Sequence, residues 1–232
     1  MSAPNEIRLI GYPVSNYFNI VRAALIEKDL AHELDICSAN QGEPFLAKNP
    51  MGKVPVLAVD DNYFAETLPI LEYLDDCHEK IKLRPDNLAM RAKMRQINNI
   101  VQVYLEVPAR ALYPAIFMGQ PDSPVQVEIF AIAMDRVITA LSRLLKPAPF
   151  LLGEAFSQAD IFTYYNLGMA ERVAESSLGR SLVDELTLND WWDEMGQRPS
   201  TQIVMRDFEI YLATYLEEKK SDYKLVPHFS QK

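Results

Sequence analysis

The sequence has few cysteines, histidines and glycines, and each shortage argues against a class of protein. Its two cysteines, Cys37 and Cys77, lie far apart and outside any C-x-x-C pair, which indicates reduced thiols rather than a disulfide framework. The three histidines have no metal-ligand spacing, and the eight glycines form no G-x-G-x-x-G or P-loop element. We therefore expect neither a metal site nor a nucleotide-binding enzyme.

The sequence also has no excess of positive charge and no long apolar run. Its net charge of -9 would repel nucleic acids and anionic membranes, so we expect neither as a partner. No signal-like N-terminus or apolar stretch long enough to cross a bilayer is present. With 49% hydrophobic and 24% charged residues, the 232-residue chain predicts a cytoplasmic globular protein of one or two domains.

The stretch from Asn49 to Leu57 contains a proline where a buried strand is otherwise expected. Pro55 interrupts the apolar run and has no N–H to give to a sheet ladder. A cis bond costs only about 0.5–1 kcal/mol before proline. If the Val54–Pro55 bond is cis, the N–H and C=O of Val54 face outward and can pair with an extended peptide. The stretch therefore predicts a peptide-binding edge.

The first third of the chain has the pattern of a small α/β domain. Apolar runs and turn residues predict two parallel strands joined by a helix, then a hairpin across Asp60-Asp61-Asn62, then a helix that Thr67 caps with its hydroxyl. The expected strands are 7–11, 31–36, 54–59 and 63–65. The order, with a short uncertain helix before the hairpin, is βαβαββα.

The remainder of the chain is predicted to be helical. Residues 85–90 read as a linker between a domain at 1–84 and an all-helical domain at 91–232. The expected helices include a long one from Leu88, which Pro108 should kink or end, and a second at 125–146. Ser157 and Asp160 form an S-x-x-D capping box whose role is structural.

Three of these segments resemble the cytosolic glutathione transferase superfamily. The first is N-P-x-G-K-V-P-x-L at 49–57, followed by Glu66-Thr67 at the start of a helix. The others are F-L-x-G-x-x-x-S-x-A-D at 150–160 and a tryptophan, Trp191, followed by R-P-S at 198–200. The resemblance covers nearly the whole chain. It implies a thioredoxin-like N-terminal domain, an all-helical C-terminal domain and glutathione as co-substrate, without a metal.

The resemblance assigns a group to each part of glutathione. The backbone of Val54 would pair with the cysteinyl residue, and Thr67 with its helix N-terminus would hold the γ-glutamyl carboxylate. Glu66 would take the γ-glutamyl ammonium, and Lys53 would neutralise a ligand carboxylate. Pro55 would be the structural cis-proline. Each residue alone is more simply explained as a cap or a solvated charge; their joint spacing favours the site.

Two hydroxyl residues are candidates for activating the glutathione thiol. Ser15 stands seven residues before Arg22, and this spacing resembles that of the serine-type transferases, which include the zeta- and tau-like enzymes. The chain looks like a bacterial member of that group. Tyr12 is the alternative, because Gly11-Tyr12 at a strand end resembles the tyrosine-type enzymes. No cysteine occupies this turn, which argues against the glutaredoxin-like and omega-like members.

The resemblance implies transfer of glutathione to a small hydrophobic electrophile held by the helical domain. Tyr104, Tyr113, Phe117 and Met118 are candidates for that pocket wall, although aromatic residues at helical spacing are more often core. A homodimer is also implied. The alternatives are a glutathione-dependent isomerase or peroxidase and, outside enzymes, a protein resembling stringent starvation protein A that binds RNA polymerase.

Overall fold

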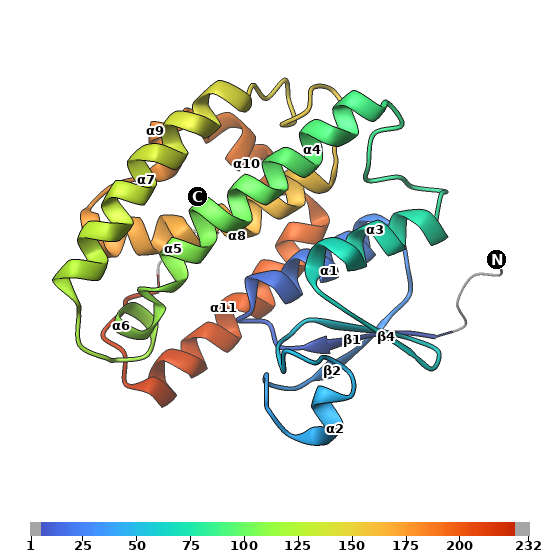
Figure 1. Cartoon of the computed structure of the whole chain (residues 1–232), viewed down its shortest axis with the longest axis horizontal. Helices are drawn as coiled ribbons and strands as arrows, with labels where there is room; N and C mark the ends of the chain where they lie inside the picture. The colour runs from blue at the N-terminus through green and yellow to red at the C-terminus, as the bar shows by residue number, and fades with distance from the viewer. Residues whose placement is uncertain (1–5, 226–232) are drawn as a thin grey trace. The chain divides into compact units, whose positions relative to one another are not determined.

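The computed structural model describes residues 6–225, which fall into two compact units, 1–84 and 85–232 (Figure 1). The elements of the first unit are β1 (Ile7–Gly11), α1 (Asn16–Glu27), β2 (Glu33–Ile36), α2 (Glu43–Leu46), β3 (Val56–Val59), β4 (Asn62–Ala65) and α3 (Thr67–Cys77). This is the βαβαββα order that the sequence predicts. The expected α/β class of the first unit is confirmed.

The sheet of the first unit has the strand order β2-β1-β3-β4. Strand β1 is parallel to β2, as the helical crossover between them predicts, and β3 is antiparallel to β4 in the expected hairpin. Strand β3 is also antiparallel to β1, so the hairpin completes the sheet along the edge of β1. The sequence pattern did not predict this last pairing, because it joins residues that are 46 to 52 positions apart.

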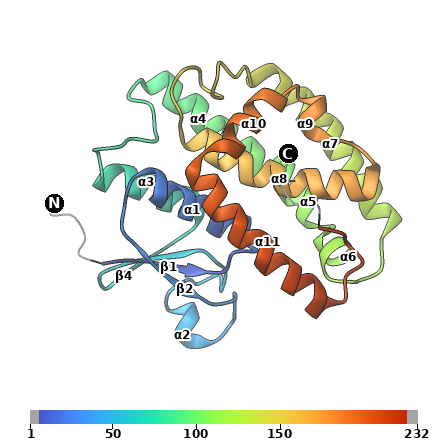
Figure 2. The same ribbon diagram turned by 180° about the vertical axis from the view of Figure 1, so that it is seen from behind.

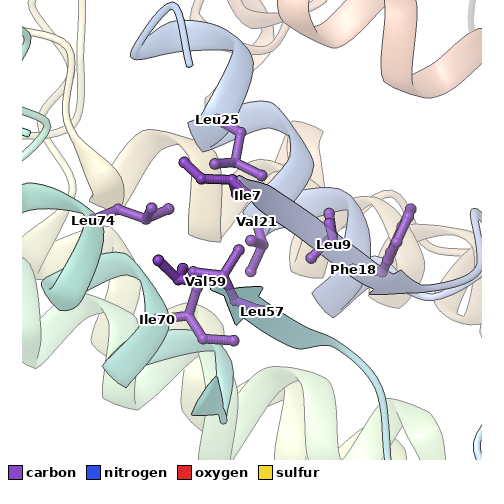
Figure 3. Close-up of a cluster of buried hydrophobic side chains, with 9 residues drawn as sticks. All are labelled: Ile7, Leu9, Phe18, Val21, Leu25, Leu57, Val59, Ile70 and Leu74. Atoms are coloured by element: carbon purple, nitrogen blue, oxygen red, sulfur yellow. The ribbon is translucent and has the colours of Figure 1, made fainter. Parts of the chain in front are cut away.

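Alternation along the strands sends side chains to two hydrophobic clusters. On one face, residues of β1 and β3 meet residues of α1 and α3 (Figure 3). On the other, Ile10, Val56 and Ala58 pack with Phe45 of the short helix α2. The cluster in Figure 3 comprises Ile7, Leu9, Phe18, Val21, Leu25, Leu57, Val59, Ile70 and Leu74. Both faces of the sheet are therefore covered, as in other α/β units.

A buried ion pair joins the ends of α1 and α3. The Nζ of Lys28 donates to Asp75 at 2.5 Å and to the carbonyls of His78 at 2.9 Å and Ile81 at 2.5 Å. Asp75 also accepts from the backbone N–H of Leu83 at 3.0 Å. Because the buried charges are paired and hydrogen-bonded on both sides, their desolvation cost is offset. The contacts hold the chain between α3 and the end of the first unit.

The second unit consists of helices (Figures 1 and 2). They are α4 (Leu88–Ile100), the π-helical segment η1 (Val101–Glu106), α5 (Val107–Arg110), α6 (Tyr113–Phe117), α7 (Pro124–Leu144), α8 (Gln158–Leu178), α9 (Leu182–Glu185), α10 (Asn189–Gln197) and α11 (Pro199–Lys219). Helix α8 packs against most of the others, and its first four turns are buried on every side. A helix in that position has no solvent-facing stripe.

The first long helix, α4, begins at Leu88 as expected, because Asn87 accepts from the N–H groups of Ala89 and Met90 and caps it. Its first turn therefore lies inside the segment that was expected to be a linker, 85–90. Pro108 was expected to kink or end this helix; the helical path continues past it to Arg110. The π-helical turn directly before Pro108 changes the i−4 bonding pattern that proline would otherwise disrupt. The next helix covers Pro124–Leu144 instead of 125–146.

The capping box at the start of α8 is confirmed, and Asp160 does more than cap. Its buried carboxylate accepts from the N–H of Ser157 at 2.9 Å, from the N–H of Leu151 at 2.8 Å and from Nε1 of Trp191 at 3.0 Å. Burial nevertheless raises the pKa of the Asp160 carboxyl above its usual value. One side chain thus joins the loop before α8, the start of α8 and helix α10.

Replacing Ser157 and Asp160 in turn distinguishes a residue that only caps a helix from one that also joins several segments. Ser157→Ala should lower the free energy of unfolding by about 0.5–2 kcal/mol, the usual loss for an N-cap. Asp160→Ala should cost more, roughly 3–5 kcal/mol, because it leaves several buried donors without an acceptor. Urea unfolding measures both values. A smaller loss for Asp160→Ala than for Ser157→Ala would contradict the junction role.

Candidate functional site

The strand register brings three separate segments to one edge of the sheet. Ile10 of β1 pairs with Val56 of β3, and Val56 pairs with Ala65 of β4. The turn after β1, the residues before β3 and the residues after β4 therefore leave the sheet at the same edge. These segments contain the predicted site residues of the first unit, which are Tyr12, Ser15, Lys53, Val54, Pro55, Glu66 and Thr67.

The end of β1 lies directly against Val54. A Cβ atom built on Gly11 would stand 2.5 Å from a ring carbon of Phe18 and 3.2 Å from the Cβ of Val54. The φ angle of Gly11, 153°, also lies where residues with a side chain are strained. Only glycine allows this approach. The residues that follow it, from Tyr12 to Ser15, therefore begin next to Val54.

Ser15 is the N-cap of helix α1. Its Oγ accepts from the N–H of Phe18 at 3.3 Å, and its own N–H donates to the carbonyl of Tyr12 at 3.0 Å, which closes a turn. The side chain is half-buried. Because the hydroxyl acts here as an acceptor, its proton remains able to donate to a ligand. The positive end of the α1 dipole lies at the same position and favours a negative charge there.

Tyr12, the alternative hydroxyl, is the first residue after β1 and is half-buried. Asn19 of α1 fixes the turn that carries both candidates, because its Nδ2 donates to the carbonyl of Pro13 at 2.7 Å. Asn19 is buried, and no motif in the sequence singles it out. Arg22, which set the spacing from Ser15, is buried on the same helix.

The Val54–Pro55 peptide bond is cis, and Pro55 is buried. Within residues 6–225 the backbone N–H and C=O of Val54 have no hydrogen-bond partner, although Val56 onwards pairs in the sheet. Lys53, directly before Val54, has an exposed side chain, and its carbonyl accepts from Nδ2 of Asn49 at 2.6 Å. An unpaired strand-like backbone beside a sheet edge is the geometry that extended peptides use for binding.

The start of α3 differs from the expectation in one respect. Thr67 is not the cap but the first helical residue, and it is buried; Glu66 stands at the cap position without a side-chain hydrogen bond to the helix. Glu66 has a φ of 67°, which is unusual for a residue with a side chain. The N–H groups that open α3 thus receive no side-chain cap from Glu66, and such helix ends bind anions.

Cys37 is the cysteine that follows β2 at the same edge. Its N–H donates to the carbonyl of Gly11 at 2.9 Å, and it packs beside Val54 against the cluster around Ile10. Burial, with a contribution from the nearby charge of Asp35, raises the pKa of the Cys37 thiol. A thiol with a raised pKa is a poor nucleophile near neutral pH. Burial therefore disfavours the thiolate form of Cys37 at this edge.

The four aromatic and methionine candidates of the helical unit do not form one wall. Tyr104 lines an apolar cavity of ≈ 410 Å³ together with Pro108 and residues of α7 such as Val137. Tyr113 and Phe117 are buried and stack edge to face with ring centroids 5.3 Å apart. Met118 is half-buried at the end of α6. The structure thus leaves the electrophile pocket unassigned.

Two further properties of the described residues bear on the site. Between residues 6 and 225 no three His, Cys, Asp or Glu side chains are grouped to hold a metal ion. In the same range no helix combines the length and apolar composition needed to cross a membrane.

Comparisons with known proteins match both units of the chain. Residues 9–82 match the family model of the glutathione S-transferase N-terminal domain, and residues 124–195 match that of the C-terminal domain. A glutathione S-transferase of Pseudomonas putida is 30% identical over 216 residues, which cover 93% of this chain and 98% of the relative. A probable maleylacetoacetate isomerase of Caenorhabditis elegans is 34% identical over 84 residues, 35% of this chain and 39% of its own.

Solved structures give the same fold. A glutathione S-transferase of Methylobacterium radiotolerans, in complex with glutathione sulfonate, superposes with a TM-score of 0.71 at 22% identity, covering 86% of this chain and 94% of its own. The identity of the Pseudomonas relative extends over both units, and both domain models match in the expected order. The chain therefore belongs to the glutathione S-transferase family.

Proposed function

We propose that this glutathione transferase binds glutathione at the edge formed by Ser15, Val54 and Glu66-Thr67, and activates its thiol as the thiolate for attack on a small hydrophobic electrophile. The observation that carries the proposal is the register of β1, β3 and β4, which brings the three segments to one edge. Each segment there has a group suited to one part of the tripeptide. The reactive sulfur is assigned to the substrate, since burial raises the pKa of the Cys37 thiol and disfavours its thiolate.

The binding roles follow from the local contacts. The unpaired N–H and C=O of Val54 bind the cysteinyl backbone in the manner of an added strand. The N-terminus of α3 and the Thr67 hydroxyl hold the γ-glutamyl carboxylate, and Glu66 receives the γ-glutamyl ammonium. Lys53 has an exposed ammonium beside this edge and neutralises a ligand carboxylate.

The activation step belongs to Ser15. Its Oγ already accepts a hydrogen bond from the N–H of Phe18, so the hydroxyl proton can be donated to the sulfur of glutathione. A hydrogen bond to a charged group is worth about 1.5–3 kcal/mol, which lowers a thiol pKa of about 8.5 by roughly one to two units. Most of the bound glutathione is then thiolate at neutral pH. The dipole of α1 acts in the same direction.

The same thiolate would serve a glutathione-dependent isomerase or peroxidase. The match to a probable maleylacetoacetate isomerase covers only 35% of the chain and does not favour isomerisation over transfer. A role like that of stringent starvation protein A needs no thiol site, so the hydroxyl and the unpaired Val54 backbone support the enzyme instead. The homodimer, the cytoplasmic location and the electrophile stay predictions.

Binding and turnover test the proposal together. The protein should be retained on immobilised glutathione and should then convert at least one compound in a panel of aryl halides, maleyl compounds and peroxides. Conjugation of aryl halides would support transfer, whereas turnover of maleyl compounds or peroxides alone would favour the isomerase or peroxidase. Failure to bind glutathione would contradict the proposed site and favour a partner-binding protein.

The choice between the two hydroxyls can be measured directly. Ser15→Ala should raise the pKa of the bound glutathione thiol and slow conjugation by roughly ten- to a hundredfold, equivalent to about 1.4–2.7 kcal/mol. Its affinity for glutathione should change much less, since other groups bind the charged ends. Ultraviolet titration of the thiolate and steady-state rates provide both readouts. If Tyr12→Phe loses the low pKa and the rate while Ser15→Ala keeps them, Tyr12 is the activating residue.

A glycine at position 66 tests the binding role of the Glu66 carboxylate separately from the effect of its strained backbone on stability. Glu66→Gly removes the carboxylate and makes the φ of 67° acceptable, so the free energy of unfolding should change by less than about 1 kcal/mol. Glutathione affinity should fall about tenfold or more, because the charge-assisted contact between the Glu66 carboxylate and the γ-glutamyl ammonium is lost. Calorimetric titration and urea unfolding give the two values.

Asp60 supplies the matched control. It also has a positive φ, 51°, but lies in the hairpin turn at the opposite end of β3. Asp60→Gly should therefore change stability to a similar extent and leave glutathione affinity as it is. Equal affinity losses in both variants would show that Glu66 acts through the sheet and not through its carboxylate.

A further inference from the structure

The residues before the cis Val54–Pro55 bond form a turn organised by a buried asparagine. Asn49 is 2% exposed; its Oδ1 accepts from the N–H of Met51 at 2.9 Å, and its Nδ2 donates to the carbonyl of Lys53 at 2.6 Å. Its backbone carbonyl accepts from the N–H of Gly52 at 2.8 Å. One residue thus bonds the turn at three successive positions, 51, 52 and 53.

The same turn is held from its exposed side by the preceding loop. Nε2 of Gln41 donates to the carbonyl of Met51 at 3.3 Å. Gly52 has a φ of 63°, and a Cβ there would stand 2.2 Å from Nε2 of Gln41 and 2.6 Å from the carbonyl oxygen of Asn40. The loop and the turn are therefore in close contact. The side-chain amide of Gln41 thus bonds the protein itself.

The turn needs this support because it lies outside the sheet. The ladder of β3 begins at Val56, so no strand pairing fixes Lys53 or Val54. The bond from Asn49 to the carbonyl of Lys53 is the last contact of the turn before Val54. An edge that is already ordered spares the ligand the entropic cost of ordering it.

We propose that Asn49 is a positioning residue for glutathione: its amide holds the Asn49–Lys53 turn so that the backbone of Val54 stands ready to pair with the peptide. The inference rests on the proposed glutathione site. Among residues 6–225, the hydrogen bonds of the Asn49 side chain run to Met51 and Lys53 and none reaches the turn that carries Ser15. Asn49 therefore acts on binding and not on activation of the thiol.

Two variants test this role in the full-length protein. Asn49→Ala should weaken glutathione affinity by about tenfold, while kcat at saturating glutathione stays within about threefold of wild type. The glutathione affinity of Asn49→Ser should lie between those of wild type and Asn49→Ala, because a serine hydroxyl can accept from the N–H of Met51 but does not reach the carbonyl of Lys53. In the free enzyme, amide hydrogen exchange of the 49–57 segment should accelerate in the order wild type, Ser, Ala.

Asn98→Ala is the matched control. Asn98 is also a buried asparagine, 1% exposed, but it lies on α4 in the helical unit. Its replacement should leave glutathione affinity and exchange of the 49–57 segment unchanged, even if it alters stability. All variants are compared well below their melting temperatures.

The outcomes are distinct. If the Asn49 variants bind glutathione as tightly as Asn98→Ala, or lose kcat at unchanged affinity, the positioning role is wrong. If exchange of the 49–57 segment is unaffected by Asn49→Ala, the amide does not hold the turn and the inference is likewise overturned. If the wild-type protein fails to bind glutathione, it is the proposed function that fails, and exchange alone then decides whether Asn49 holds the turn.

Discussion

The antiparallel pairing of β3 with both of its neighbours determines where the groups of the site lie. Pairing of Val56 with Ile10 and with Ala65 leaves Gly11, Val54 and Glu66 at a common edge. A shift of one residue in either ladder would move the flanking segments apart and turn the buried side chains of β3 to the wrong face. Leu57 and Val59 pack in the cluster on one face of the sheet and Val56 and Ala58 in the cluster on the other, so a shift would exchange the two sets between the clusters. The hydrophobic core thereby fixes the geometry of a polar site.

Several groups at this edge are left in states that a protein selected only for stability would avoid. Glu66 has a positive φ and α3 lacks a side-chain cap at that position, each of which costs on the order of 1 kcal/mol. The backbone of Val54 is unpaired next to a sheet. An anionic peptide would satisfy the helix end and the strand-like backbone together. These local costs are consistent with a site that is completed by its ligand.

Much of this could be predicted from the sequence, since the informative signals were local. Pro55 within an apolar run predicted that sheet pairing would be interrupted there, although the strand was expected from residue 54 and begins at Val56. Ser157 with Asp160 predicted the start of α8, and that capping box is present. Thr67 was wrongly expected to cap α3, because hydroxyl preference at N-caps does not foresee that Glu66 adopts the non-helical conformation instead. Pro108 was expected to kink or end the first long helix, but the helical path continues to Arg110, and the π turn before the proline leaves no signal in composition.

Contacts between distant segments were not predictable in this way. The pairing of β1 with β3 and the hydrogen bond from Asn19 to Pro13 depend on the three-dimensional path of the folded chain. Asn49 had a usable signal, because asparagine followed by proline and glycine is typical of a turn in which the side chain bonds the backbone two residues on. Its second bond, to Lys53, appears only in the folded chain.

Asp160 and Asn49 show how one kind of contact serves two purposes. Both are buried polar side chains that bond backbone groups of a neighbouring loop. Asp160 joins the buried helix α8 to helix α10 through Trp191. Its hydrogen bonds therefore contribute to the free energy of unfolding of the whole unit. The bonds of Asn49 hold a turn outside the sheet ladder, which can open without unfolding the rest. Loss of the first contact should therefore lower global stability, whereas loss of the second should appear as weaker binding at an edge that has become less ordered.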